Sequence, residues 1–156
     1  MKATPLKDIK NELNDLSQLE LKEICLRLAR FKKENKELLS YILFGANNEA
    51  DYIEAVKQYI DEQFELINTN SFFFIKKSMR KILTQTKKHI RYSKKKETEI
   101  ELLIYFCKKQ KAFTPSIKNN TQLQNVYNRQ LIIIKKNILT LHEDLQYDYN
   151  IILDTL

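Results

Sequence analysis

Apolar residues recur at three- and four-residue steps along most of the chain, which is the period of amphipathic α-helices. No segment carries the alternating pattern of a convincing strand. The pattern predicts an all-α fold with six to eight helices. Representative apolar series are Leu21, Ile24, Leu28 and Phe31; Tyr52, Val56, Ile60, Phe64 and Ile67; and Ile100, Leu103, Ile104 and Cys107.

Residues with capping preferences mark where the first helices begin and end. Thr4 is expected to cap a short first helix that has Pro5 in its first turn. Ser17 and Glu20 form a capping box for a second helix. Gly45, the only glycine, stands where a left-handed residue would end the next apolar stripe. We therefore interpret this glycine as a helix terminator.

Polar segments separate the later helices. Asn47 or Asn48 is expected to cap a helix with acidic residues in its first turn. Breaks are predicted at 68–71 and 93–96, and the proline-containing segment 112–121 is the clearest loop. A helical period resumes after this loop and continues to the end of the chain.

Short connections between successive helices predict antiparallel hairpins, packed as a bundle or, as the alternative, a short HEAT-like array. We expect a single all-helical domain over 1–156. Its subdivisions would be an acidic half at 1–70, a basic hairpin at 71–111, and one long helix or a helix pair at 121–156. A bend at Thr140 to Asp144 would separate the members of such a pair.

Composition removes two large enzyme classes. The chain has 156 residues, 43% of them hydrophobic and 30% charged, with one glycine. Dinucleotide-binding and phosphate-binding loops of the common types need several glycines, so neither is present. Cys25 and Cys107 stand alone and are expected to be small core residues of a reduced, cytoplasmic protein. No window approaches the length of a membrane span, and we expect no membrane partner.

Positive charge is concentrated in the middle of the chain. The net charge is −3 over residues 1–70, +11 over 71–118 and −1 over 119–156. The stretch 72–96 contains ten Lys or Arg residues and no acid. Such an asymmetry raises the hypothesis of an anionic partner.

A helix over 72–96 would separate apolar from basic side chains. Its apolar arc consists of Phe72, Ile75, Met79, Ile82, Leu83, Thr86 and Ile90. Burial of that arc requires exposure of the other side. The candidate polyanion-binding residues on the basic side are Lys77, Arg80, Lys81, Lys87, Lys88, Arg91 and Lys95.

Three interpretations of this basic side remain open. It is a solvated face that acidic neighbours partly neutralise, a surface that follows the phosphates of a polyanion, or a surface for an acidic protein or a membrane. Phe73, His89 and Tyr92 lie beside the cations and have the rings to stack on bases, although packing is the favoured role.

No catalytic or metal-binding constellation is found in the sequence. His89 and His142 are the only histidines, and zinc spacings and paired E-x-x-H motifs are missing. We therefore expect a non-enzymatic protein without a metal or cofactor. The function hypothesis is polyanion binding, preferably of nucleic acid and without strong sequence preference. The alternative is a helical protein-interaction module, with homo-oligomerisation through the C-terminal helix as a further expectation.

The first 45 residues resemble the start of small bacterial helical proteins known only as a domain of unknown function. The residues that carry the resemblance are Leu6, Lys7, Leu13, Leu16, Ser17, Glu20, Leu21, Glu23, Leu26, Lys36, Glu37 and Leu38. The resemblance implies an all-helical bacterial cytosolic protein and assigns no activity or site residue.

Overall fold

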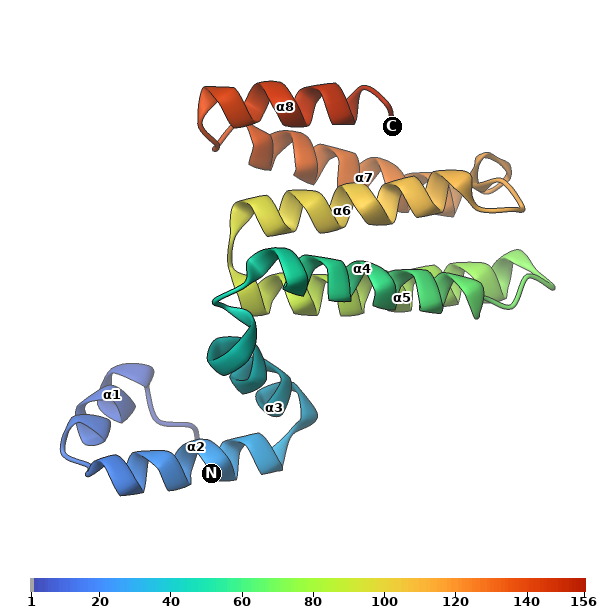
Figure 1. The fold of residues 1–156 in the computed structure, drawn as a ribbon. Coiled ribbons are helices and arrows are strands. Elements are labelled where there is room, and N and C mark those ends of the chain that lie inside the picture. Colours follow the sequence, from blue (N-terminus) through green and yellow to red (C-terminus); the bar gives the residue numbers. More distant parts are fainter. Residues whose placement is uncertain (1) are drawn as a thin grey trace. The chain divides into compact units, whose positions relative to one another are not determined.

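The computed structural model describes residues 2–156, and these form eight α-helices and no strand (Figure 1). The all-α prediction is confirmed. The helices are α1 (Leu6–Asn14), α2 (Gln18–Phe31), α3 (Lys33–Ser40), α4 (Glu49–Glu65), α5 (Phe72–Ser93), α6 (Lys96–Ala112), α7 (Thr121–Ile138) and α8 (Glu143–Leu153). A π-helical segment, Tyr41–Gly45, follows α3, and a short 3-10 helix, Ile117–Asn119, precedes α7.

Packing divides the described residues into two compact units, one ending at Phe44 and the other beginning at Gly45. The charge pattern of the sequence predicted a first subdivision near residue 70, where the net charge changes sign. The acidic α4 instead packs with α5 and α6 in the second unit. Charge composition was a poor guide to the division because apolar contacts hold α4 in place.

The second unit consists of antiparallel hairpins arranged in two layers. In Figure 1, α4, α6 and α8 lie in front, while α5 and α7 lie behind them. The helices of one layer also meet, since α4 packs on α6 and α5 contacts α7. Successive helices alternate between the two layers, which confirms the predicted antiparallel hairpins. A short helical array would have the same arrangement.

Helix α6 is the centre of the core. It packs against α4, α5 and α7 and buries residues on most of its sides, among them Ile100, Leu102, Phe106 and Cys107, while Glu97 and Lys108 stay exposed. The ring of Phe106 meets that of Phe64 edge-on at 5.7 Å between centroids. The expectation of a one-sided apolar stripe on α6 was therefore too narrow.

Several predicted helix starts are confirmed, but the predictions for Pro5 and Gly45 are wrong. Ser17 and Glu20 form the capping box, and Asn48 caps α4 by accepting from the Asp51 amide. Pro5 occupies the N-cap of α1, so it is not in the first turn. Gly45 has no positive φ because the chain passes through π-helical geometry there instead of reversing in a left-handed turn.

The C-terminal segment forms a helix pair. α7 ends at Ile138 and α8 begins at Glu143, so the break overlaps the predicted bend. His142 caps α8, and its Nδ1 atom lies 3.4 Å from the Asp144 amide nitrogen. The alternative of one long helix is thereby excluded.

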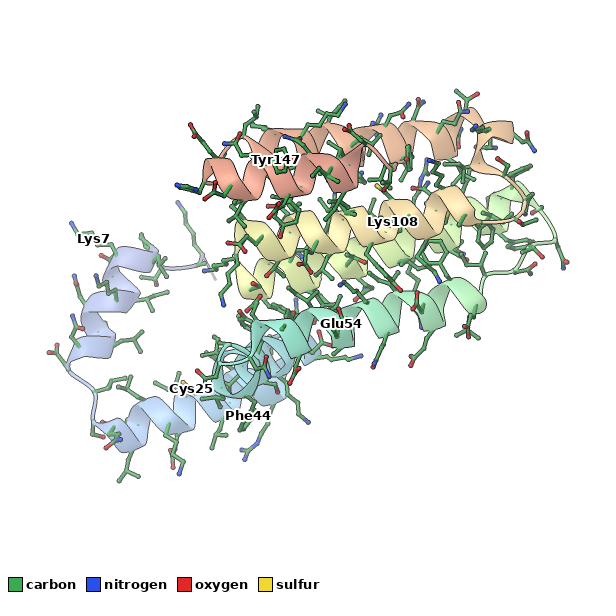
Figure 2. All side chains as sticks on the ribbon, turned by 45° about the horizontal axis from the view of Figure 1, so that its top comes forward. Lys7, Cys25, Phe44, Glu54, Lys108 and Tyr147 are labelled. Carbon is green, nitrogen blue, oxygen red and sulfur yellow. The ribbon has the colours of Figure 1, made fainter. Side chains whose placement is uncertain are left out.

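The first unit lacks the interior that its apolar pattern predicts. None of α1, α2 and α3 contains a buried residue, and Leu6, Leu19 and Phe31 are 75–81% exposed. Figure 2 shows the side chain of Lys7 extending away from the ribbon of α1. Cys25 is exposed, so its predicted core role is wrong, whereas Cys107 is buried as predicted.

Hydrogen exchange should reflect this difference in burial. Amides of α1 and α2 should exchange at least about 100-fold faster than those of α6, because local opening is least costly where few apolar contacts must separate. Mass spectrometry of deuterium uptake in peptides from each helix would measure this. Equal protection of α1 and α6 would contradict the expectation.

None of the helices within residues 2–156 combines the length and the apolar character that crossing a bilayer requires.

Candidate functional site

Helix α5 separates its side chains as the sequence predicted. Ile75, Met79, Ile82, Thr86 and Ile90 are buried against the neighbouring helices. Leu83 is also buried, and Phe72 is half-buried. The opposite side of the helix is therefore turned away from the core.

The predicted cations differ in their surroundings. Lys77, Arg80, Lys81 and Arg91 are exposed, and their charged groups have no hydrogen-bond or ion-pair partner in the described chain. Lys88 is half-buried and interacts with other groups. These residues all lie on α5, so the helix presents a row of cations to solvent.

Lys95 does not belong to that row, and its predicted place on the helix is wrong. Helix α5 ends at Ser93, and Lys94 takes a left-handed conformation with φ 59°. The chain therefore turns before Lys95, whose Nζ lies 2.9 Å from Oε2 of Glu49 at the start of α4. Lys95 thus helps to hold the α5–α6 turn against α4.

Lys87 is half-buried, and the Glu99 carboxylate of α6 acts on its charge. Burial lowers the pKa of its ammonium group, while the Glu99 carboxylate acts in the opposite direction. Acidic neighbours therefore act on Lys87 and Lys95, at the C-terminal end of the predicted surface. The solvated-face interpretation expects acidic neighbours to neutralise the basic side of α5. Among the described residues, Glu49 and Glu99 act in this way on its C-terminal end.

Charge is strongly divided between the two layers of the second unit. Helix α5 has seven Lys or Arg residues, α7 has three, and neither has an Asp or Glu. In the other layer, α4 has six acidic residues and one lysine, α8 has three acidic residues and no Lys or Arg, and the central α6 has three glutamates and four lysines. The basic character therefore belongs to a whole layer of the fold and extends beyond one helix.

A groove of about 500 Å³ runs between α5 and α7. Arg80 and Lys87 line it from α5, and Arg129 lines it from α7. Leu83, Val126 and Ile133 contribute apolar surface to the same groove. Sequence reasoning missed Arg129 because the residues next to it in the sequence are uncharged. Only the packing of α7 beside α5 brings Arg129 to the basic surface.

A second, smaller hollow of about 290 Å³ lies further toward the start of α5. It is lined by Phe73, Lys76, Lys77 and Arg80. Because Arg80 lines both hollows, they are adjacent along the helix. We call the two hollows together the α5/α7 track.

The three aromatic candidates beside the cations have different roles. His89 lies among Tyr52, Tyr59 and Tyr92, with ring centroids 6.2, 5.9 and 5.7 Å away. The Tyr52 hydroxyl also donates to the His89 carbonyl at 3.0 Å. Packing therefore accounts for His89 and Tyr92, as favoured from the sequence, whereas Phe73 is 65% exposed.

The other titratable groups with shifted pKa values are buried or take part in hydrogen bonds within the packed structure. Burial raises the pKa values of Cys107 and Tyr149 to about 12, so both are protonated at neutral pH. Burial and a 2.6 Å hydrogen bond to Asp61 raise the pKa of Tyr105 to about 12. Burial alone would raise the pKa of Asp61, but hydrogen bonds from Tyr105 and Lys109 outweigh it and lower that pKa.

Metal ligands do not gather within the described residues. Among residues 2–156, no group of three or more His, Cys, Asp or Glu side chains is placed to hold a metal ion. His142 is exposed, and its Nδ1 lies 3.6 Å from the Asp144 carboxylate.

Comparison with known proteins finds no matching family model, no similar curated protein and no similar solved structure. The resemblance of the first 45 residues to a domain of unknown function therefore stays a prediction. The proposed function rests on the charge and the shape of the surfaces described above.

Proposed function

We propose that this protein binds nucleic acid through the basic layer formed by α5 and α7, contacting the phosphate backbone without strong sequence preference. The observation that carries the proposal is the lack of any acidic residue on these two helices, which together carry ten cations. Crowded like charges destabilise a helix by a few tenths of a kcal/mol per pair. Phosphates that pair with these cations would relieve the repulsion and release counterions.

The exposed cations are available for such contacts. Lys77, Arg80 and Lys81 occupy the first half of α5, away from the acidic groups that act on Lys87 and Lys95. Arg129 adds a cation from α7 across the groove. This arrangement supports a backbone-binding surface better than it supports a merely solvated face.

The proposal predicts binding that weakens steeply with salt. Fluorescence anisotropy of labelled single-stranded RNA and duplex DNA should show micromolar or tighter binding at low salt. The logarithm of the affinity should fall linearly with the logarithm of salt concentration, by about 0.9 per duplex phosphate contacted or about 0.7 per single-strand phosphate. The triple variant Lys77→Glu, Arg80→Glu, Lys81→Glu should bind at least tenfold more weakly and with a shallower slope.

The matched control reverses three charges elsewhere. Lys7→Glu, Lys10→Glu and Lys22→Glu change the net charge by the same amount on exposed positions of α1 and α2. This control should retain most of the affinity. Negligible binding of the wild type at low salt, or equal losses in both triple variants, would refute the proposal.

A second candidate function, interaction with a protein partner, is favoured by the apolar surface of α1, α2 and α3. These helices expose Leu6, Leu19 and Phe31 and bury nothing. Co-purification of a partner with the wild type, and its loss in a Leu19→Glu, Phe31→Glu variant, would support this candidate. Homo-oligomerisation through α8, which exposes Tyr147 and Ile151, also stays a prediction.

A further inference from the structure

Phe73 lies near the start of α5, beside the cations of the smaller hollow. Its side chain is 65% exposed, and its ring meets the neighbouring Phe74 ring edge-on at 5.5 Å. An exposed phenyl ring leaves a large apolar area in water, which is unfavourable. The ring lines a hollow together with Lys77 and Arg80, so a ligand that these cations hold would also cover the ring.

The rest of the α5/α7 track has the same mixed character. Past Arg80, the groove combines the cations Lys87 and Arg129 with the apolar side chains of Leu83, Val126 and Ile133. From Phe73 to Lys87 the track follows α5 for roughly 21 Å, at 1.5 Å per residue. A ligand that matches it carries anionic groups and apolar surface along its length, with an apolar face where it meets the Phe73 ring.

Single-stranded nucleic acid has this combination of groups. Its phosphates pair with Lys and Arg, and its unpaired bases expose faces that stack on aromatic and apolar side chains. A duplex hides those faces in its own stack, so Phe73 and the apolar part of the groove would gain nothing from it. The track therefore discriminates between the two forms of nucleic acid.

We infer that the α5/α7 track is a binding site for single-stranded nucleic acid, in which Phe73 stacks on a base while Lys77, Arg80 and Arg129 contact phosphates. This inference rests on the proposed function and adds the strand form of the ligand and an uncharged contact residue. Phe73 sets the preference for single strands, and the cations supply the affinity that both forms share.

The test compares one single strand with a duplex of the same length. Fluorescence anisotropy is measured with a labelled 20-nucleotide oligothymidine and a labelled 20-base-pair duplex at the same salt concentration. The wild type should bind the single strand at least tenfold more tightly. Phe73→Ala should weaken single-strand binding by roughly 5- to 150-fold, which corresponds to one stacked base. Its duplex affinity and its salt slope should stay unchanged.

Two variants separate stacking from general effects. Phe73→Trp keeps an aromatic face and should restore single-strand binding. Tyr147→Ala removes an aromatic ring of similar exposure, 69%, from the acidic α8 and should leave both affinities unchanged. Circular dichroism should show every variant folded, because both rings are exposed.

The outcomes distinguish this inference from the proposed function. Equal affinity for single strand and duplex, with no effect of Phe73→Ala, would overturn the single-strand site and leave backbone binding standing. Salt-independent or negligible binding of both nucleic acids would overturn both proposals. Displacement of the single strand by polyglutamate at equal charge concentration would also overturn this inference, because it would show that stacked bases are not needed.

Discussion

Phe106→Ala should lower the free energy of unfolding by about 3–5 kcal/mol. Phe106 is fully buried on α6, at the centre of the second unit, and its ring packs edge-on against Phe64. The truncation removes apolar contacts and leaves a cavity among α4, α6 and their neighbours, which a packed core cannot fill by relaxing. Since domains are stable by only about 5–15 kcal/mol, the variant would lose a large fraction of its stability.

Urea unfolding followed by circular dichroism measures this loss. Phe73→Ala is the matched control, because it removes the same ring from an exposed position of the same unit. Its effect on stability should lie within about 0.5 kcal/mol, as for most surface substitutions. A cost below about 1 kcal/mol for Phe106→Ala would contradict the central position of α6 in the core.

Glu49→Ala should destabilise the protein by about 2–3 kcal/mol. The Glu49 carboxylate accepts hydrogen bonds from the hydroxyls of Ser93 and Thr98, and it pairs with Lys95 at 2.9 Å. Thr98 is fully buried, so removal of the carboxylate leaves its hydroxyl without this acceptor. The substitution also releases the α5–α6 turn from the first turn of α4.

Thermal and urea unfolding of Glu49→Ala and Glu54→Ala would test this expectation. Glu54 lies on the same helix with its side chain 64% exposed, and its ion pair with Lys57 is of the weak i,i+3 surface type. Its removal should cost about 0.5 kcal/mol or less. Similar losses in the two variants would show that the Glu49 contacts do not anchor α4.

Most of the second unit was predictable because its apolar stripes are covered where the helical period places them. Val56, Ile60, Ile75, Ile100 and Ile134 are all buried. The same reasoning failed for the first unit, where Leu6 and Leu28 follow an equally regular period and stay exposed. A period shows which face of a helix is apolar, but it contains no information about whether another helix covers that face.

The candidate site was predictable in part for a related reason. Lys77, Arg80 and Lys81 lie on one helix, so local geometry was sufficient to group them on its exposed side. Lys95 was misplaced because a single left-handed residue, Lys94, ended the helix before it. Arg129 was missed because its position beside Arg80 depends on how α7 packs.

The sequence by itself determined the all-α class, most helix boundaries and the basic side of α5. These features depend on interactions within a few residues, such as the capping box at Ser17 and the spacing of Ile75 and Met79. Only the tertiary structure decided that α6 is buried on most of its sides, that α5 and α7 form one layer without acids, and that Arg80 and Arg129 line one groove. These features depend on contacts between residues far apart in the chain, which no local pattern specifies.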